Sequence, residues 1–298
     1  QSGEFAGRVD EVEVIFINQA DCTKVLLEID RKARGVSGFF ASMFDLDETI
    51  GHFILIRNIW DSLERFVNYN KLIHTFTQKD FNTILDKFPE LFRPGILSIL
   101  SSLKKKKRQG LCKGIMVYTN NRYSKEWVYR LINYIEYKLG GDVFNNIILA
   151  FKLNGTIQEP CRTSKDKKYT DLIRCCRLPY NIELCYFDDV IYPEMDIDNV
   201  YYLKVKPYYY YYTPDDIIKR LFNVEVIQKI VYNNSENEET IKNNSSIFTK
   251  YILKYLEMKN VACLSKDPHE LGVDKIVTKR MITHLHVFFT RFFPGFID

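Results

Sequence analysis

The sequence has 298 residues, of which 46% are hydrophobic, 27% charged and 14% aromatic. This composition excludes collagen-like, coiled-coil and wholly disordered proteins, and the length corresponds to one large domain or two small ones. The 42 Lys and Arg residues against 38 Asp and Glu residues give a net charge of +4. That charge is too balanced to indicate a nucleic-acid-binding protein by itself.

The first 35 residues are predicted to form a β-rich extension. Two short runs with strand character, at 13–18 and 24–29, favour a hairpin or an additional sheet edge. Residues 1–8 are typical of an expression-vector remnant and do not enter the fold prediction.

Five short apolar segments further along the chain are predicted to be strands, with helical patterns between them. The predicted strands are 38–44, 114–118, 147–151, 183–187 and 200–205. Helical periodicity occupies most of 56–103, 124–139 and 170–177. This alternation predicts a three-layer, Rossmann-like α/β domain over 36–212 with a mostly parallel sheet, and a helical insertion at 52–92.

Residues 213–298 are predicted to form a helical C-terminal region. It begins with a Thr-Pro-Asp-Asp helix start. The stretch 233–246 is rich in Asn, Glu and Ser and is predicted to be a linker, with helices expected near 246–259 and 277–290. A protein partner of the chain is expected to bind through this region.

Two runs of similar residues stand out from the rest of the sequence. Five consecutive Tyr at 208–212 are expected to form a strand edge or a surface loop, with a stacking platform for bases as the alternative. The basic run at 104–108 is expected to be a solvated surface segment, with a phosphate-rich partner as the alternative. We therefore do not expect nucleic acid to be the main partner.

The seven cysteines are predicted to be reduced thiols in an intracellular compartment. Their number is odd, and the sequence has neither a C-x-x-C motif nor a Cys/His pair with ligand spacing. The neighbours Cys175 and Cys176 suit neither a disulfide nor a zinc site. No apolar run of 18 residues is present, so no membrane span is predicted.

Polar residues follow three of the predicted strands, at the point where each strand ends. They are Asp45 with Asp47, Thr119, and Asp188 with Asp189. Because the carboxyl ends of parallel strands share one edge of a sheet, we expect these residues to converge there. One carboxylate can attack phosphorus and another can exchange protons with the leaving oxygen and with water. The remaining pair suits Mg²⁺, and a hydroxyl and a lysine would hold phosphoryl oxygens.

These segments resemble the motifs of a known family. Asp45-Leu46-Asp47-Glu48-Thr49 resembles motif I of the haloacid dehalogenase superfamily, in the variant of the NLI-interacting-factor-like, RNA polymerase II CTD-phosphatase-like branch. Further similar segments are Arg93-Pro94-Gly95, Val117-Tyr118-Thr119-Asn120-Asn121 for motif II and Phe187-Asp188-Asp189 for motif IV. The likeness is closest to phosphatase-like proteins of large DNA viruses and covers about 39–212. For such a protein the compartment would be the host cytoplasm, the nucleus or the virion.

The resemblance implies a Mg²⁺-dependent phosphomonoester hydrolase that works through an aspartyl-phosphate. Asp45 would be the nucleophile and Asp47 the general acid and base. The implied phosphate-binding residues are Thr119, Asn120, Lys167 and Lys168. The implied metal ligands are Asp45, Asp188, Asp189 and, through its backbone carbonyl oxygen, Asp47. The motif III lysine is Lys165, Lys167 or Lys168, and the spacing to the following Asp-Leu favours Lys167.

Three functions are compatible with the sequence. The substrate of a phosphatase of this branch would be a phosphoprotein, although the insertion at 52–92 leaves room for a covered site that takes a small molecule. The alternative is a catalytically silent phosphatase fold that serves as a structural or interaction component of a virion or transcription complex. A nucleic-acid phosphatase is the third, suggested by the basic run at 104–108. Of the five histidines, His52 is the one expected nearest to the site.

Overall fold

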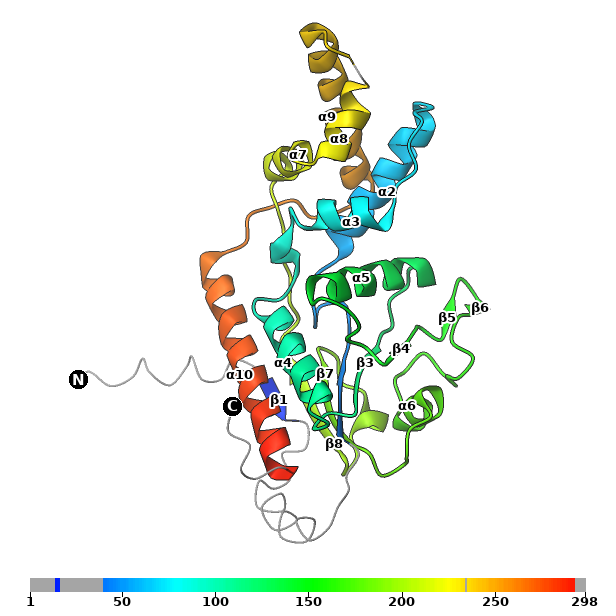
Figure 1. The fold of residues 1–298 in the computed structure, drawn as a ribbon, viewed down its shortest axis with the longest axis vertical. Helices are drawn as coiled ribbons and strands as arrows, with labels where there is room; N and C mark the ends of the chain where they lie inside the picture. The colour runs from blue at the N-terminus through cyan, green and yellow to red at the C-terminus, as the bar shows by residue number, and fades with distance from the viewer. Residues whose placement is uncertain (1–13, 17–39, 234, 293–298) are drawn as a thin grey trace, which may run out of the picture.

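The computed structural model describes residues 14–16, 40–233 and 235–292. It contains an α/β fold built on a central sheet of six strands (Figure 1). Along the sheet the strands are β1 (Val14–Phe16), β8 (Val200–Val205), β7 (Glu183–Asp188), β2 (Phe40–Phe44), β3 (Gly114–Tyr118) and β4 (Asn146–Ile148). The five from β8 to β4 are parallel, and β1 pairs antiparallel with β8 at one edge.

The sheet is the middle of three layers, as predicted for a Rossmann-like architecture. Residues on β2 alternate between two hydrophobic clusters: Phe40 and Phe44 face one, and Ala41 and Met43 face the other. The first cluster is covered by α4 (Ile96–Arg108), α5 (Lys125–Lys138) and α10 (Pro268–Phe292), and the second by α6 (Tyr169–Cys176) (Figure 1). All five residues of β2 are buried, which explains the continuous apolar run in the sequence.

The predicted strands correspond closely to the structure, with one shift. The strand expected at 147–151 is β4, and it ends at Ile148. The chain then turns into a small hairpin of β5 (Lys152–Leu153) and β6 (Thr156–Ile157). The predicted strand at 24–29 and residues 1–8 lie outside the described residues.

The segment at 52–92 is helical, as the periodicity predicts. It contains α2 (Ile54–Tyr69), α3 (Gln78–Leu85) and the short 3-10 helix η1 (Pro89–Leu91). Helix α2 buries an apolar stripe against α9 (Glu238–Met258), where Phe66 meets Phe248 edge to face at 5.2 Å. The insertion therefore packs on helices that come almost 200 residues later in the chain.

The predicted linker at 233–246 is wrong from residue 238 onward, because α9 begins there. Asn237 caps this helix by accepting a hydrogen bond from the amide of Thr240 at 3.0 Å. Two glutamates fill the first turn, which is favourable at a helix N-terminus. The polar composition that suggests a linker is thus the exposed start of a long helix.

The other helices of the C-terminal region also join the main core. Helices α7 (Pro214–Phe222) and α8 (Glu225–Tyr232) extend the same apolar cluster, and α10 contacts β8 and β1. Within the described residues, no helix is both long and apolar enough to cross a membrane.

The Tyr run at 208–212 is neither a strand edge nor a wholly exposed loop. Tyr208 and Tyr212 are buried, and their hydroxyls donate to the carbonyl oxygen of Glu90 at 2.6 Å and to its carboxylate at 2.5 Å. Tyr209 is exposed. Two of the five rings thus fix the loop to the helical insertion, so the expected strand edge or surface loop does not describe Tyr208 and Tyr212.

Candidate active site

The polar residues at the strand ends converge on one edge of the sheet. Register places Phe44 of β2 level with Val117 of β3 and with Phe187 of β7. The residues that follow these three are therefore brought to the same level at the carboxyl ends of the strands. Together with neighbouring side chains they line a cavity of about 270 Å³. Its lining includes Asp45, Asp47, Glu48, Ile54, Thr119, Asn120, Asn121, Arg122, Tyr123, Asp188, Asp189 and Tyr192.

Lys167 links two of these carboxylates from beneath the cavity. Its Nζ lies 2.5 Å from Oδ1 of Asp45 and 2.6 Å from Oδ2 of Asp188, and its side chain is 1% exposed. Burial lowers the pKa of Lys167, but the charges of Asp188 and Asp45 outweigh this effect and hold the pKa above its ordinary value. The lysine is therefore a fixed positive charge between the ends of β2 and β7.

The structure separates the three lysines that the sequence leaves as alternatives. Lys168 directs its ammonium to Glu194 at 2.9 Å, on the exposed side of the segment. Lys165 is exposed, and its carbonyl oxygen accepts from Arg162 at 2.7 Å. Of these three lysines, only Lys167 contacts Asp45 and Asp188, so the prediction that Lys168 binds phosphate has no support in this geometry.

Three carboxylates form a group suited to a metal ion. Oxygen atoms of Asp45, Asp188 and Asp189 all lie within 4.8 Å of one another. Oδ1 of Asp188 accepts from the amide of Val190 at 2.8 Å, and Oδ1 of Asp189 accepts from the Thr49 hydroxyl at 3.1 Å, so both are oriented. Carboxylate oxygens are ligands that Mg²⁺ prefers. The expected contribution of Asp47 is its backbone carbonyl oxygen, and its carboxylate is not part of this group.

The charge balance at the site favours a cation. Burial raises the pKa of Asp45 well above its ordinary value; Lys167 opposes this rise, and Asp188 and Asp47 add to it. Burial followed by the charge of Asp188 also raises the pKa of Asp189. Lys167 compensates only part of the repulsion between the carboxylates of Asp45, Asp188 and Asp189. A divalent cation among their oxygen atoms would offset the rest.

Asp47 has a different environment from Asp45. Its Oδ2 accepts a 2.6 Å hydrogen bond from Nδ2 of Asn121, and it lies on the cavity wall. Burial raises the pKa of Asp47 to about 6, although the Asn121 hydrogen bond opposes the rise. Two carboxylates two residues apart are therefore tuned differently, as expected for groups with separate roles in acid–base chemistry.

The three residues that follow β3, Thr119, Asn120 and Asn121, also line the cavity. Thr119 is buried, and its hydroxyl accepts from the amide of Asn121 at 2.9 Å, which closes a tight turn after β3. The Asn120 side chain donates to the hydroxyl of Tyr192 at 2.9 Å. Thr119 and Asn120 thus reach the cavity, and Asn121 supports Asp47.

Arg93 holds the loop after β2 in place from inside the protein. This fully buried guanidinium donates 2.7 Å hydrogen bonds to the carbonyl oxygens of Thr49, Glu48 and Lys206. Glu48 adopts a left-handed backbone conformation with φ 58°, which is uncommon for a residue with a side chain. The R-P-G motif marks this arginine in the sequence, but its role in the loop becomes visible only in the fold.

Two residues fall outside the expected arrangement. His52 bonds to the carbonyl oxygen of Tyr210 at 2.9 Å and does not line the cavity. Tyr186, which sequence reasoning missed, donates its hydroxyl to Asp188 from within the sheet. Residues two apart on a strand have side chains on the same face of the sheet, so Tyr186 lies on the face of Asp188. This spacing could have identified Tyr186 from the sequence.

A comparison of the chain with family models, with curated proteins and with solved structures finds no match. The functional argument therefore depends on the geometry of the site.

Proposed function

We propose that this protein is a Mg²⁺-dependent phosphomonoester hydrolase of the haloacid dehalogenase type, working through an aspartyl-phosphate. The observation that carries the proposal is the placement of Lys167 between Asp45 and Asp188, with Asp47 beside them on the cavity wall. A nucleophile, a second carboxylate with a pKa of about 6 and a fixed cation are the groups that phosphoryl transfer requires.

In the first step, a carboxylate oxygen of Asp45 forms a bond to phosphorus while the bond to the leaving oxygen breaks. Lys167 fixes the other oxygen of Asp45 and compensates charge on the transferred group. Asp47 in its acid form gives its proton to the leaving oxygen. In the second step, Asp47 takes a proton from water as that water attacks phosphorus, which releases inorganic phosphate and regenerates Asp45.

The residues that would hold Mg²⁺ are Asp45, Asp188 and Asp189, the acidic group described above. The ion supplies positive charge that neutralises the phosphate and lowers its repulsion by the Asp45 carboxylate.

The surroundings of the cavity leave room for a substrate whose bulk stays outside it. A second cavity of about 630 Å³ shares Asn120, Arg122 and Tyr192 with the 270 Å³ cavity at the acidic residues. Exposed Ile54 and Arg122 are part of the lining of the 270 Å³ cavity. These features support a phosphorylated protein side chain as the substrate.

A nucleic-acid phosphatase receives less support from the same structure. The basic run at 104–108 ends α4, directly before the amino end of β3, whereas the site lies at the carboxyl ends. Lys104 donates to the carbonyl oxygens of Leu139 and Gly141, and Lys107 to that of Val143. These lysines thus stabilise the fold at the far edge of the sheet from the cavity.

The test is hydrolysis of p-nitrophenyl phosphate with Mg²⁺, with EDTA, and in Asp45→Asn. We expect Mg²⁺-dependent turnover that is lost in Asp45→Asn and kept in Asp142→Asn, a control at an exposed carboxylate. Absence of turnover by the folded, Mg²⁺-loaded protein would contradict the proposal and favour the silent component of a larger complex. A comparison of phosphopeptides with nucleotides and sugar phosphates then tests the substrate class, because a phosphoprotein phosphatase prefers the peptides.

A further inference from the structure

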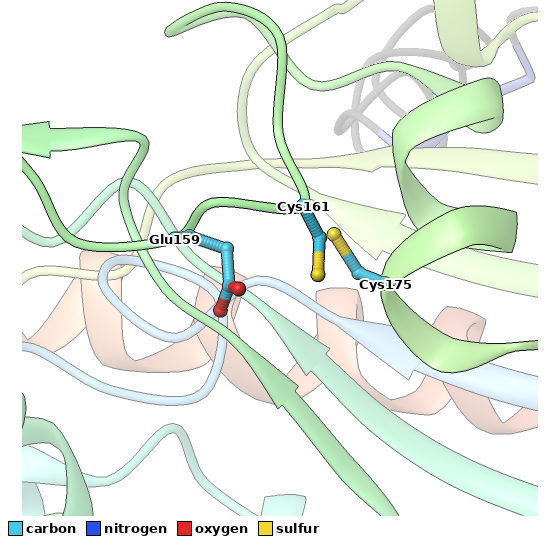
Figure 2. Close-up of side chains that lie close together, drawn as sticks. All are labelled: Glu159, Cys161 and Cys175. Atoms are coloured by element: carbon cyan, nitrogen blue, oxygen red, sulfur yellow. The ribbon is translucent and has the colours of Figure 1, made fainter.

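A second group of metal-ligating side chains lies away from the acidic site. It consists of Glu159, Cys161 and Cys175, whose carboxylate oxygen and two sulfur atoms all lie within 4.8 Å of one another (Figure 2). Glu159 and Cys161 belong to the segment that follows β6, and Cys175 lies in the last turn of α6. All three are half-buried, so solvent ions can reach them.

Neighbouring contacts hold these residues in position. The carbonyl oxygen of Cys161 accepts from Nε of Arg174 at 2.7 Å, and Arg174 also pairs with Asp171 at 2.7 Å. Asp171 in turn accepts from the amide of Thr163 at 2.8 Å. The segment that carries Cys161 is therefore tied to α6 directly beside Cys175.

The position of Glu159 is fixed by backbone contacts. Its carbonyl oxygen accepts from the amide of Arg162 at 3.1 Å, and its carboxylate lies 3.4 Å from the amide of Leu149. The sulfur atoms of Cys161 and Cys175 thus face each other, with the Glu159 side chain beside them (Figure 2). A ligand set that is already ordered loses little conformational entropy when it binds an ion.

The donor atoms identify the class of ion. Thiolate ligands select soft or borderline metals such as Zn²⁺ over Mg²⁺. Tetrahedral zinc with such ligands has bond lengths that separate neighbouring ligand atoms by about 3.4–3.8 Å. Because the three ligand atoms lie within 4.8 Å of one another, each pair needs to close by at most about 1.0–1.4 Å.

We propose that Glu159, Cys161 and Cys175 bind a Zn²⁺ ion, with water in the fourth position. The sequence conceals this site, because the two sulfur ligands are 14 residues apart and Cys175 pairs in space with Cys161 rather than with its neighbour Cys176. The site shares no residue with the acidic group and does not depend on the proposed phosphatase activity.

The location of the zinc site gives it a structural consequence. Lys167 lies between Cys161 and Cys175 in the chain, so the ion would close the segment that carries this lysine at both ends. The zinc would therefore stabilise the placement of Lys167 beneath Asp45 and Asp188. This role is positional, since the sulfur ligands do not line the cavity.

The first test is titration of the whole protein with Co²⁺, which replaces Zn²⁺ and gives a thiolate charge-transfer band in the near ultraviolet. We expect one equivalent to produce the band. Cys161→Ser and Cys175→Ser should each weaken binding by more than the roughly 100-fold that losing an outer-sphere partner costs. Cys263→Ser, a control at another half-buried thiol, should leave the band unchanged, as should Asp188→Asn, since oxygen ligands give no such band.

A second measurement uses the unmodified protein and does not rely on variants that could misfold. We expect Zn²⁺ to protect Cys161 and Cys175 from alkylation by iodoacetamide, as read from peptide masses, while Cys263 reacts at its original rate. The proposal is overturned if the wild type gives no band, if the band survives both cysteine variants, or if Zn²⁺ leaves the alkylation pattern unchanged. A disulfide between Cys161 and Cys175 in protein purified without chelators would overturn it in favour of a redox pair.

Discussion

Replacing Lys167 by Met would remove the charge that holds Asp45 and Asp188 together while keeping an unbranched side chain of similar length. Both ion pairs are buried, at 2.5 and 2.6 Å. Removing one partner of a buried pair costs about 3–5 kcal/mol, because the charge that remains has no compensation. At about 2.1 cal/mol/K per residue, the unfolding entropy of this chain converts that loss to a fall in melting temperature of roughly 5–8 °C.

The effect of Lys167→Met should depend on pH in one direction. Burial already raises the pKa of Asp45, and loss of the Lys167 charge raises it further. A carboxyl group whose folded pKa lies above its unfolded pKa destabilises the fold at high pH, and this penalty fades as the pH falls through the folded pKa. The gap between variant and wild type should therefore be larger at pH 7.5 than at pH 5.5.

The assay is thermal unfolding followed by circular dichroism, with Lys168→Met as the matched control. Lys168 forms a partly exposed pair with Glu194 at 2.9 Å, and such pairs contribute about 0–1 kcal/mol, so its variant should melt within about 2 °C of the wild type. The reasoning is refuted if Lys167→Met melts as the wild type does, or if the two variants lose equal stability. This experiment also tests the choice of Lys167 without any assumption about activity.

Three further predictions concern other parts of the site and fold. Arg93→Met should lower stability by about 3 kcal/mol or more, because the carbonyl oxygens of Thr49 and Lys206 lose their charged donor and that of Glu48 keeps only the amide of Tyr208; a urea titration in which its midpoint equals that of the wild type would contradict this role. The basic limb of the pH–rate profile should lie near the Asp47 pKa of about 6, since activity needs the acid form. The Asn121 hydrogen bond lowers the pKa of Asp47, so in Asn121→Ala that pKa should rise and the basic limb should move to higher pH. A limb that does not move would argue against Asp47 as the acid. Asn237→Ala should cost about 1 kcal/mol by removing the cap of α9, and amide hydrogen exchange should increase in the first turn of that helix but not in α10.

The strands and the acidic residues at their ends could be predicted because both depend on local pattern. A buried parallel strand is a short, continuous apolar run, and its end is marked by the first polar residue, as at Asp45 and Asp188. Because the strands are parallel, their carboxyl ends lie at the same edge of the sheet, so the acidic residues could be placed together from the sequence alone. The choice of Lys167 could not be completed in this way, because Lys165, Lys167 and Lys168 are similar in sequence and differ only in burial.

The interactions that were missed depend on contacts between distant segments. Arg93 meets the loop after β2 only when α4 packs on the sheet. The linker predicted at 233–246 was wrong for a different reason: the start of α9 has the polar composition of a linker, although the helix continues to a buried apolar face. A polar composition indicates that a segment is exposed to solvent. It does not distinguish an exposed helical turn from a linker, because both are exposed.

The Tyr run at 208–212 also limits where the chain can be truncated without disturbing the site. The amide of Tyr208 donates to the carbonyl oxygen of Glu48 at 2.7 Å, the same oxygen that accepts from Arg93. A truncated protein that ends before Tyr208 would lose this contact, and with it both anchors on Glu90. Deletion studies that treat the last 90 residues as a removable tail would therefore alter the loop that carries Asp47. A loss of activity in such a fragment would report on this loop and would not show that the C-terminal helices bind the substrate.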